Sequence, residues 1–315
     1  PAAHREEPRM PRVVATGLQF PEGPIAMPDG SVVLVEIRRQ TLTRVGTDGR
    51  AEVIAHLGGG PNGAAIGPDG LCYVCNNGGF RWHSAGGLTL PGGQGDDYTG
   101  GRIERVDLAT GRVERLYDAV DGFPLRGPND IVFDAHGGFY FTDLGKGRSR
   151  DLDRGGVYYG RADGGGVKKV LYHLMTPNGV GLSPDGSTLY VAETETARLW
   201  AWKIRAPGEV DPTPADAPNG GRMLWASPTF VRYDSLAVEA GGNVCVATLH
   251  DAGVTVISPA GGRVEFVPVS SDDFLVTNLC FGGPDLRRAY VACSGSGKLV
   301  ELDWARPGLK LLQQR

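Results

Sequence analysis

The chain has 315 residues and carries 36 acidic against 32 basic side chains, a net charge of −4. This balance argues against a nucleic-acid partner, because phosphate backbones are bound by clustered Lys and Arg. No run approaches the roughly 20 consecutive apolar residues of a membrane span, and no basic segment followed by an apolar core opens the chain. We therefore expect a cytoplasmic protein that binds no membrane.

One pattern recurs six times: a polar residue, an apolar strand, a turn built on Gly, Pro and Asp residues, and a second apolar strand. The copies read PEGPIAMPDGSVVLVEI, PNGAAIGPDGLCYVCNN, PNDIVFDAHGGFYFTDL, PNGVGLSPDGSTLYVAET, YDSLAVEAGGNVCVATL and TNLCFGGPDLRRAYVACS. Their polar residues are Glu22, Asn62, Asn129, Asn178, Asp234 and Asn278. Copies about 40 to 70 residues apart are typical of propeller blades with some long loops.

A second hairpin with alternating apolar and polar residues follows most copies. These hairpins are TLTRVGTDGRAEVIA, GRIERVDLATGRVERLY, GGVYYGRADGGGVKKVLYHL, GVTVISPAGGRVEFVPV and, more loosely, KLVELDWARPGLKLL. Two hairpins make one four-stranded sheet, so we predict an all-β fold: a six-bladed β-propeller with four antiparallel strands per blade. Residues 11–18 should supply the outer strand of the last blade and close the ring. Residues 11–315 then form a single domain, preceded by a flexible N-terminus, residues 1–10.

The cysteines and one glycine motif have structural explanations. Cys72 and Cys75 lie three apart in one strand and therefore point to opposite faces, which disfavours a shared metal or a redox pair. We expect all five cysteines to be reduced and buried. Gly58, Gly60 and Gly63 match the dinucleotide-binding pattern, but they lead into a strand instead of a helix. This match predicts a loop between repeats.

The polar residues of the repeat should meet around the propeller axis, because equivalent positions in repeats lie in equivalent places. Carboxylate and amide oxygens favour Ca²⁺, with Zn²⁺, Mn²⁺ or Mg²⁺ as alternatives. Glu22 and Asp234 would neutralise one divalent ion, and Asn129 and Asn178 would add neutral donors. Positions would remain open for water and substrate, as Lewis-acid catalysis requires.

A second interpretation is that these residues only satisfy backbone groups at strand ends. We favour this interpretation for Asn62 and Asn278. It explains the acidic members less well, because like charges brought to one axis repel each other unless a cation or a proton lies between them.

Four segments carry a family resemblance: FPEGP around Glu22, PND at Asn129 and Asp130, PNGVGLSPDGSTLYVAET around Asn178, and YDSLAVEAGGNVCVATL around Asp234. Over roughly residues 15 to 305 the chain resembles the family of senescence marker protein (regucalcin), gluconolactonase and luciferin-regenerating enzyme. The resemblance implies a six-bladed propeller, lactone-hydrolysing activity, and one divalent metal bound by Glu22, Asn129, Asn178 and Asp234.

The resemblance also implies catalytic roles for two acids. Asp234 would be both a ligand and the favoured general base, and Asp130 would orient the substrate or share the proton transfer. Which of the two is the principal base stays open. Animal members have an Arg two residues before the Asn that matches Asn129, whereas Gly127 stands there in this chain and Arg126 lies one residue earlier.

The predicted function is a metal-dependent hydrolase that opens a small-molecule lactone or related cyclic ester. A metal-polarised carbonyl and a carboxylate that takes a proton from water suffice for this reaction, without a covalent nucleophile. Other interpretations stay open: another metal-assisted reaction, such as phosphotriester hydrolysis or lyase chemistry, or a non-catalytic ligand-binding propeller with a structural calcium. The oligomeric state is not predicted.

Substrate-binding residues are expected in the loops beside the metal. The Gly-rich insertion at residues 76–101 offers Phe80, Trp82 and His83, although an ordinary surface excursion is the alternative. Arg126 and His250 lie beside strands that start at the metal, and Asn129 would contact substrate as well as metal. Further candidates of the same kind are Phe123, Lys146 and Arg148. The aromatic residues favour a lactone larger or less polar than a simple sugar lactone.

Overall fold

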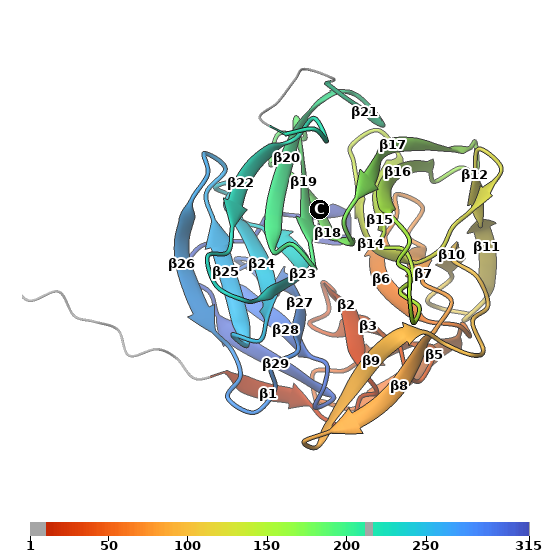
Figure 1. Cartoon of the computed structure of the whole chain (residues 1–315). Helices are drawn as coiled ribbons and strands as arrows, with labels where there is room; N and C mark the ends of the chain where they lie inside the picture. Colours follow the sequence, from red (N-terminus) through yellow and green to blue (C-terminus); the bar gives the residue numbers. More distant parts are fainter. Residues whose placement is uncertain (1–10, 212–216, 315) are drawn as a thin grey trace, which may run out of the picture.

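Six antiparallel β-sheets surround a central axis in the computed structural model, which describes residues 11–211 and 217–314 (Figure 1). The six-bladed propeller predicted from the repeats is therefore confirmed. The segment expected to be flexible, residues 1–10, lies outside the described residues.

Each blade contains four main strands, which follow one another from the axis outwards. The first blade has β2 (Pro21–Ala26), β3 (Val32–Glu36), β4 (Thr41–Val45) and β5 (Ala51–His56). The second has β6 (Pro61–Ile66), β7 (Cys72–Asn76), β10 (Arg102–Val106) and β11 (Val113–Tyr117). The third has β14 (Pro128–Phe133), β15 (Gly138–Asp143), β16 (Gly155–Arg161) and β17 (Val167–Leu174).

The other three blades repeat this order. The fourth has β18 (Pro177–Leu182), β19 (Thr188–Glu193), β20 (Arg198–Ala206) and β22 (Arg222–Ala226). The fifth has β23 (Arg232–Val238), β24 (Val244–Leu249), β25 (Gly253–Ile257) and β26 (Arg263–Pro268). The sixth has β27 (Val276–Gly282), β28 (Arg288–Cys293), β29 (Lys298–Asp303) and β1 (Arg12–Ala15).

Shorter elements extend from this ring of blades. They are the hairpins β8 (Phe80–Ala85) with β9 (Leu88–Gln94) and β12 (Ala119–Val120) with β13 (Phe123–Pro124), the short strand β21 (Glu209–Val210), and the 3₁₀ turn Leu312–Gln314. Within the described ranges, no helix is long and apolar enough to cross a membrane.

The N-terminal strand closes the ring as predicted. β1 pairs antiparallel with β29, and Arg12 Nε donates to Glu301 Oε1 over 2.9 Å. The expected hairpin in KLVELDWARPGLKLL is wrong, because β1 already occupies the free edge of β29. The chain after β29 instead turns towards the axis, where the backbone N–H of Leu309 donates to Val238 O over 2.8 Å.

The hydrophobic core is divided among the blade interfaces. Each of six apolar clusters joins strands of two neighbouring blades; one, for example, packs Val33 and Val35 of the first blade against Val74 and Val106 of the second. Because every blade buries both faces in this way, the sequences of the strands near the axis are apolar along most of their length.

The cysteine and glycine predictions agree with the structure. Cys72 packs in the cluster between the first and second blades, whereas Cys75 packs between the second and third, so the two thiols face opposite ways. All five cysteines are buried and unpaired. Gly58 and Gly60 lie in the loop that leads directly into β6, with no helix after them.

Each innermost strand departs from regular pairing where its polar repeat residue stands. In β2, for example, Glu22 pairs with Val35 and the next paired residue is Ile25, opposite Val33. Such bulges turn side chains out of the regular alternation. The same irregularity recurs in β6, β14, β18, β23 and β27.

The glycine that follows the polar residue in three repeats lets neighbouring innermost strands approach closely. A Cβ atom on Gly23 would lie 2.7 Å from the backbone nitrogen of Ala64 in the next blade. A Cβ atom on Gly63 would likewise collide with the carbonyl oxygen of Asn129. The innermost strands thus contact one another all around the axis (Figure 1).

Candidate metal and active site

The polar residues of the repeat stand near the start of the innermost strands, at the same end of the central channel. Five of the six are buried, with at most 6% of their surface exposed: Glu22, Asn62, Asn129, Asn178 and Asn278. Asp234 instead remains partly exposed. The ring therefore has one acid that solvent can reach.

Hydrogen bonds orient two of the predicted ligands. Oε2 of Glu22 accepts from Nδ2 of Asn278 over 2.6 Å and from the backbone N–H of Gly23 over 2.8 Å. Nδ2 of Asn178 donates to Oγ1 of Thr194 over 3.1 Å. The Oδ1 atom of Asn178 is buried and has no hydrogen-bond partner within the part of the chain that the structure describes.

Three carboxyl groups around the axis, those of Glu22, Asp130 and Asp234, perturb one another's pKa. Burial raises the pKa of Glu22. Burial and the nearby charge of Glu22 together raise the pKa of Asp130 to about 8. Burial and the charge of Glu22 also hold the pKa of Asp234 well above its ordinary value, although hydrogen bonding with Asn178 opposes this shift. Like charges in low dielectric produce this pattern, and a cation between them would relieve it.

These features fit a hard divalent cation. Glu22 and Asp234 offer carboxylate oxygens, and the unpartnered Oδ1 of Asn178 offers a neutral one. No group of three or more His, Cys, Asp or Glu side chains arranged to hold a metal occurs in residues 11–211 and 217–314. The predicted donor set is not a group of this kind, because two of its four members, Asn129 and Asn178, are amides.

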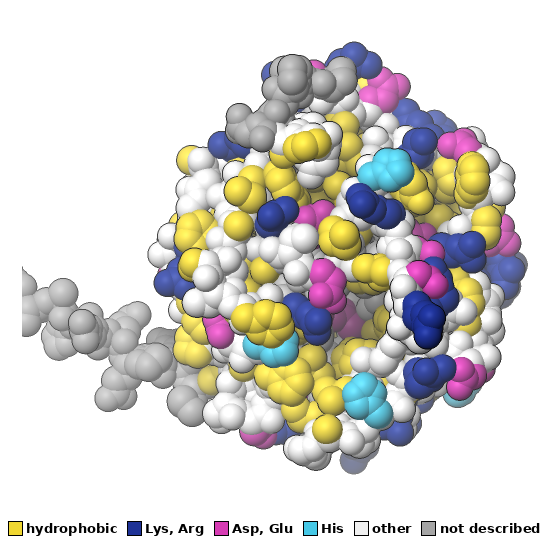
Figure 2. Space-filling view, in the orientation of Figure 1, with side chains coloured by type: hydrophobic (Ala, Val, Ile, Leu, Met, Phe, Trp, Pro, Cys, Tyr) yellow, Lys and Arg dark blue, Asp and Glu magenta, His cyan; other side chains and the backbone are white. Residues whose placement is uncertain are grey.

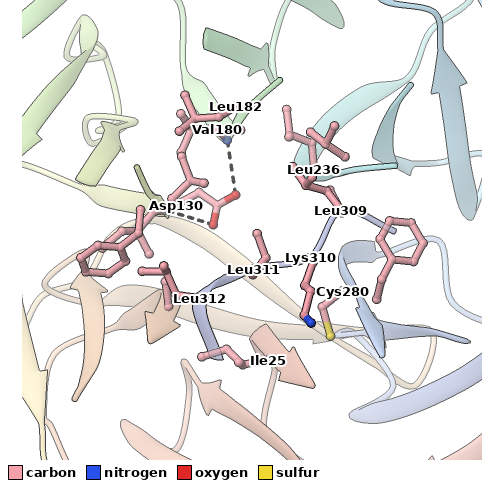
Figure 3. Close-up of a pocket in the computed structure, with 18 of the residues that line it drawn as sticks. Ile25, Asp130, Val180, Leu182, Leu236, Cys280, Leu309, Lys310, Leu311 and Leu312 are labelled. Carbon is pink, nitrogen blue, oxygen red and sulfur yellow. Dashed lines mark hydrogen bonds between the residues drawn. The ribbon is translucent and has the colours of Figure 1, made fainter. Parts of the chain in front are cut away.

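Asp130 occupies the position that glycine takes in the first, second and fourth repeats. Its carboxylate accepts the backbone N–H of Ile131 over 3.1 Å and that of Val180, in the next blade, over 3.4 Å (Figure 3). It lines a mostly apolar cavity of about 230 Å³ between the innermost strands and the C-terminal segment, residues 309–313. Asp130 thus links the third and fourth blades.

A second set of polar side chains, missed by the sequence analysis, holds the loops at the mouth of the channel. Each ends the second strand of a blade and accepts the backbone N–H of the loop before the first strand. The pairs are Glu36 with Gln19, Asn76 with Gly60, Asp143 with Arg126 and Gly127, and Glu193 with Met175, at 2.7 to 2.8 Å. The aligned endings VLVE, YVCN, YFTD and YVAE were the available signal.

The β8–β9 hairpin spans three blades at the mouth. It leaves the second blade, packs Trp82 against Phe20 at a ring-centroid distance of 5.1 Å, and reaches the sixth blade, where the N–H of Thr89 donates to Gly295 O over 2.8 Å. Phe80 and Trp82 are half-buried, whereas His83, which points to the other side of the strand, is exposed. The two aromatic side chains therefore face the protein, and His83 faces solvent.

Lys146 anchors the base of this hairpin. Its Nζ atom donates to Asn77 Oδ1 over 3.0 Å and to Gly79 O over 2.9 Å, and it lies 4.0 Å from the centroid of the Phe80 ring. Burial lowers its pKa to about 7. The exposed Arg126 contributes here through its backbone, whose carbonyl accepts the Tyr98 hydroxyl over 2.6 Å.

His250 belongs to a group of side chains beside Asp234 that the sequence analysis identified only in part. Its ring stacks on Phe274 at 5.3 Å and contacts Phe230 at 5.0 Å. Arg232, two residues before Asp234, lies 6.0 Å from the Phe230 ring and donates to Glu195 Oε2 over 3.2 Å. Hydrophobic and histidine side chains border the hollow on this face, and acidic side chains show within it (Figure 2).

Residues 20–295 match the model of a protein family described as the SMP-30/Gluconolactonase/LRE-like region. Lactonase drp35 of Staphylococcus saprophyticus is 30% identical over 250 residues, which are 79% of this chain and 69% of that protein. Gluconolactonase of Zymomonas mobilis is 24% identical over 294 residues, covering 86% of this chain and 75% of that protein.

Solved structures share the fold at lower identity. A gluconolactonase from Xanthomonas campestris superposes with a TM-score of 0.71 at 21% identity, covering 94% of this chain and 95% of that one. Regucalcin from Agrobacterium tumefaciens, described as a calcium-binding protein, gives a TM-score of 0.71 at 20% identity, covering 96% and 97%. Because the family model spans most of the propeller, this chain belongs to the SMP-30/gluconolactonase/LRE-like family.

Proposed function

We propose that this protein is a metal-dependent lactonase whose general base is Asp234. The observation that carries the proposal is the contrast within the acidic group: Asp234 is partly exposed, while Glu22 and Asp130 are buried at 3% and 7% exposure. A general base must reach water and substrate, which the partly exposed Asp234 can do. Among relatives, the names lactonase drp35 and gluconolactonase support the reaction class.

The proposed ligands are Glu22, Asn129, Asn178 and Asp234. A divalent cation bound by them would supply Lewis acidity towards the lactone carbonyl. Oxygen donors without sulfur or imidazole favour Ca²⁺, and the calcium-binding description of the Agrobacterium regucalcin supports this choice. The unpartnered Oδ1 atom of Asn178 is the observation on this chain that fits a cation best.

The proton transfers balance with Asp234 alone. As water attacks the carbonyl carbon, the Asp234 carboxylate accepts a proton from it. When the acyl C–O bond breaks, the protonated carboxyl returns that proton to the departing ring oxygen. Ring opening consumes one water and yields a hydroxy acid, which ionises and releases a proton to the medium. In this scheme Asp130 positions the third and fourth blades through its bond to Val180.

The test combines metal removal with a pH-indicator assay on a lactone panel. Turnover should disappear after chelation and return with Ca²⁺ or with Zn²⁺, Mn²⁺ or Mg²⁺. Asp234→Asn keeps an oxygen donor but loses the base, so kcat should fall by about 100-fold or more. Metal content, measured by mass spectrometry, should fall less than activity.

Asp48→Asn is the matched control, because Asp48 is an exposed acid in the β4–β5 turn, at the opposite end of its blade. It should leave turnover unchanged. Full activity of the chelated protein, or of Asp234→Asn, would contradict the proposal.

A further inference from the structure

A compact group of three side chains lies at the end of the fifth blade where β23 leads to Asp234. Phe230 lies in the loop before β23, Arg232 begins that strand, and His250 follows β24, with which β23 pairs. Phe230 is 75% exposed, which is unusual for a phenyl ring that already contacts two neighbours. An exposed aromatic side chain beside a candidate catalytic group is a candidate substrate contact.

The apolar surface at this edge continues beyond Phe230. The His250 ring stacks on Phe274 with an angle of 11° between the ring planes. Phe274 in turn packs in a cluster that includes Phe20 and Trp82. The mouth is thus bordered by an aromatic wall that runs from the fifth blade through the sixth to the β8–β9 hairpin.

Arg232 adds a charged hydrogen-bond donor to this aromatic wall. One end of its guanidinium donates to Glu195 Oε2, an exposed pair across the fourth and fifth blades. Its Nε atom is buried and lacks a hydrogen-bond partner within the described residues. The Arg232 side chain as a whole is 40% exposed, so an acceptor on a ligand can reach its guanidinium from solvent.

We propose that Phe230, Arg232 and His250 select lactones that carry an apolar ring or chain together with a hydrogen-bond acceptor. The apolar substituent packs on Phe230 and His250, and the acceptor meets the exposed part of the Arg232 guanidinium. A polyhydroxylated sugar lactone is disfavoured, because its hydroxyl groups would lose water against an aromatic wall that offers them few partners. This inference rests on the proposed lactonase function and specifies its substrate class.

The test compares two six-membered lactones that differ in polarity: δ-valerolactone with a phenyl substituent, and glucono-δ-lactone. The wild type should show a higher kcat/KM on the phenyl lactone. Phe230→Ser should raise the KM for the phenyl lactone by about tenfold with little change in kcat, and should affect glucono-δ-lactone less than twofold. Arg232→Met should also raise this KM, and Arg232→Lys should restore part of the loss.

Val264→Ser is the matched control. Val264 is an exposed apolar residue of the same blade, at 50%, but it belongs to β26, the outermost strand of that blade (Figure 1). It should leave both lactones unaffected. A wild-type preference for glucono-δ-lactone would overturn the inference, as would a Phe230→Ser variant that changes both substrates equally or neither.

Binding separates this inference from the proposed reaction. The phenyl-substituted δ-lactam has the same shape but resists hydrolysis, so its affinity can be measured by calorimetry even if no lactone is turned over. Binding to the wild type that weakens about tenfold in Phe230→Ser supports the inference, whereas absent binding, or equal binding to both proteins, overturns it. Absence of any lactone turnover would contradict the proposed function instead.

Discussion

Nδ2 of Asn278 donates to Oε2 of Glu22 over 2.6 Å, so the sixth blade orients a proposed metal ligand of the first. The Oδ1 atom of the same asparagine accepts the backbone N–H of Leu279 over 2.7 Å. Asn278 therefore fixes a strand end, as the sequence favoured, and also contacts the acidic group. Side chains that orient a metal ligand tune the affinity for the metal.

Replacing Asn278 by Ala should weaken metal binding by about tenfold or more, because Glu22 loses the donor that fixes its carboxylate. Isothermal titration of the metal-free protein with Ca²⁺ measures this effect. Asn243→Ala is the matched control: Asn243 donates to Glu239 Oε2 over 2.8 Å, a comparable Asn–Glu bond outside the ring of repeat residues. Equal Ca²⁺ affinities for the two variants would show that the bond to Glu22 has no role in binding.

Gly63→Ala should destabilise the ring where the second and third blades meet. The added Cβ atom would collide with the carbonyl oxygen of Asn129 and approach Cα of Asp130 to 2.7 Å, and neither backbone position can move alone. We expect the free energy of unfolding to fall by about 1 to 3 kcal/mol.

Urea unfolding measures the effect of Gly63→Ala, with Gly241→Ala as the control. Nothing lies within 4 Å of a Cβ atom on Gly241, and its φ is not in the left-handed region. Because the collision in Gly63→Ala displaces the backbone of Asn129, Ca²⁺ affinity should decrease as well. Unchanged unfolding midpoints for both variants would mean that the blades can separate without cost.

The repeat predicted the fold well because its pattern lies within the strands. In each blade, a polar residue, an apolar strand and a glycine-containing turn together specify the innermost hairpin. The same logic located Glu22 and Asp234, whose place depends only on the register of the repeat. It failed for the segment after β29, because alternation alone does not reveal that β1 already pairs with that edge.

The mouth of the channel was less predictable, because its side chains lie in loops that differ between blades. Trp82 was identified as a candidate, but its contact with Phe20 depends on where the β8–β9 hairpin folds over. Arg232 was overlooked, since its unpartnered Nε is a property of its surroundings in space. Lys146 likewise gains its role from Asn77, 69 positions away in the chain.

Lys146 should make stability depend on pH. Burial holds its pKa near about 7, below the ordinary 10.5, although Asp143 and Asp153 oppose the shift. Between these values the unfolded chain binds a proton that the folded protein does not, so stability rises with pH across this window, by up to about 1.4 kcal/mol per pH unit. Below pH 7 both states carry the proton, and the slope vanishes.

Thermal melts of Lys146→Met at several pH values test this dependence. The variant lacks the group, so the melting temperature of the wild type should rise relative to that of the variant from pH 7 upwards. Lys169→Met, which removes an exposed lysine from β17, should keep the wild-type slope. Parallel curves for wild type and Lys146→Met would show that Lys146 stays charged in the folded protein throughout this range.

The C-terminal segment, residues 309–313, seals the channel at the end away from the proposed metal ligands. Figure 3 shows Leu309, Leu311 and Leu312 facing the cavity lined by Ile25 and Leu236. Truncation after Pro307 should expose this apolar surface and lower the free energy of unfolding by about 2 to 4 kcal/mol. Binding of an apolar fluorescent dye should increase in parallel.

Activity should respond differently to this truncation. Residues 309–313 lie at the opposite end of the innermost strands from Glu22 and Asp234, so kcat at 25 °C should stay within about twofold of the wild type while the melting temperature falls. A truncated protein that keeps its melting temperature but loses turnover would contradict this expectation. It would assign the segment a direct part in the reaction, because activity would then fall without any loss of stability.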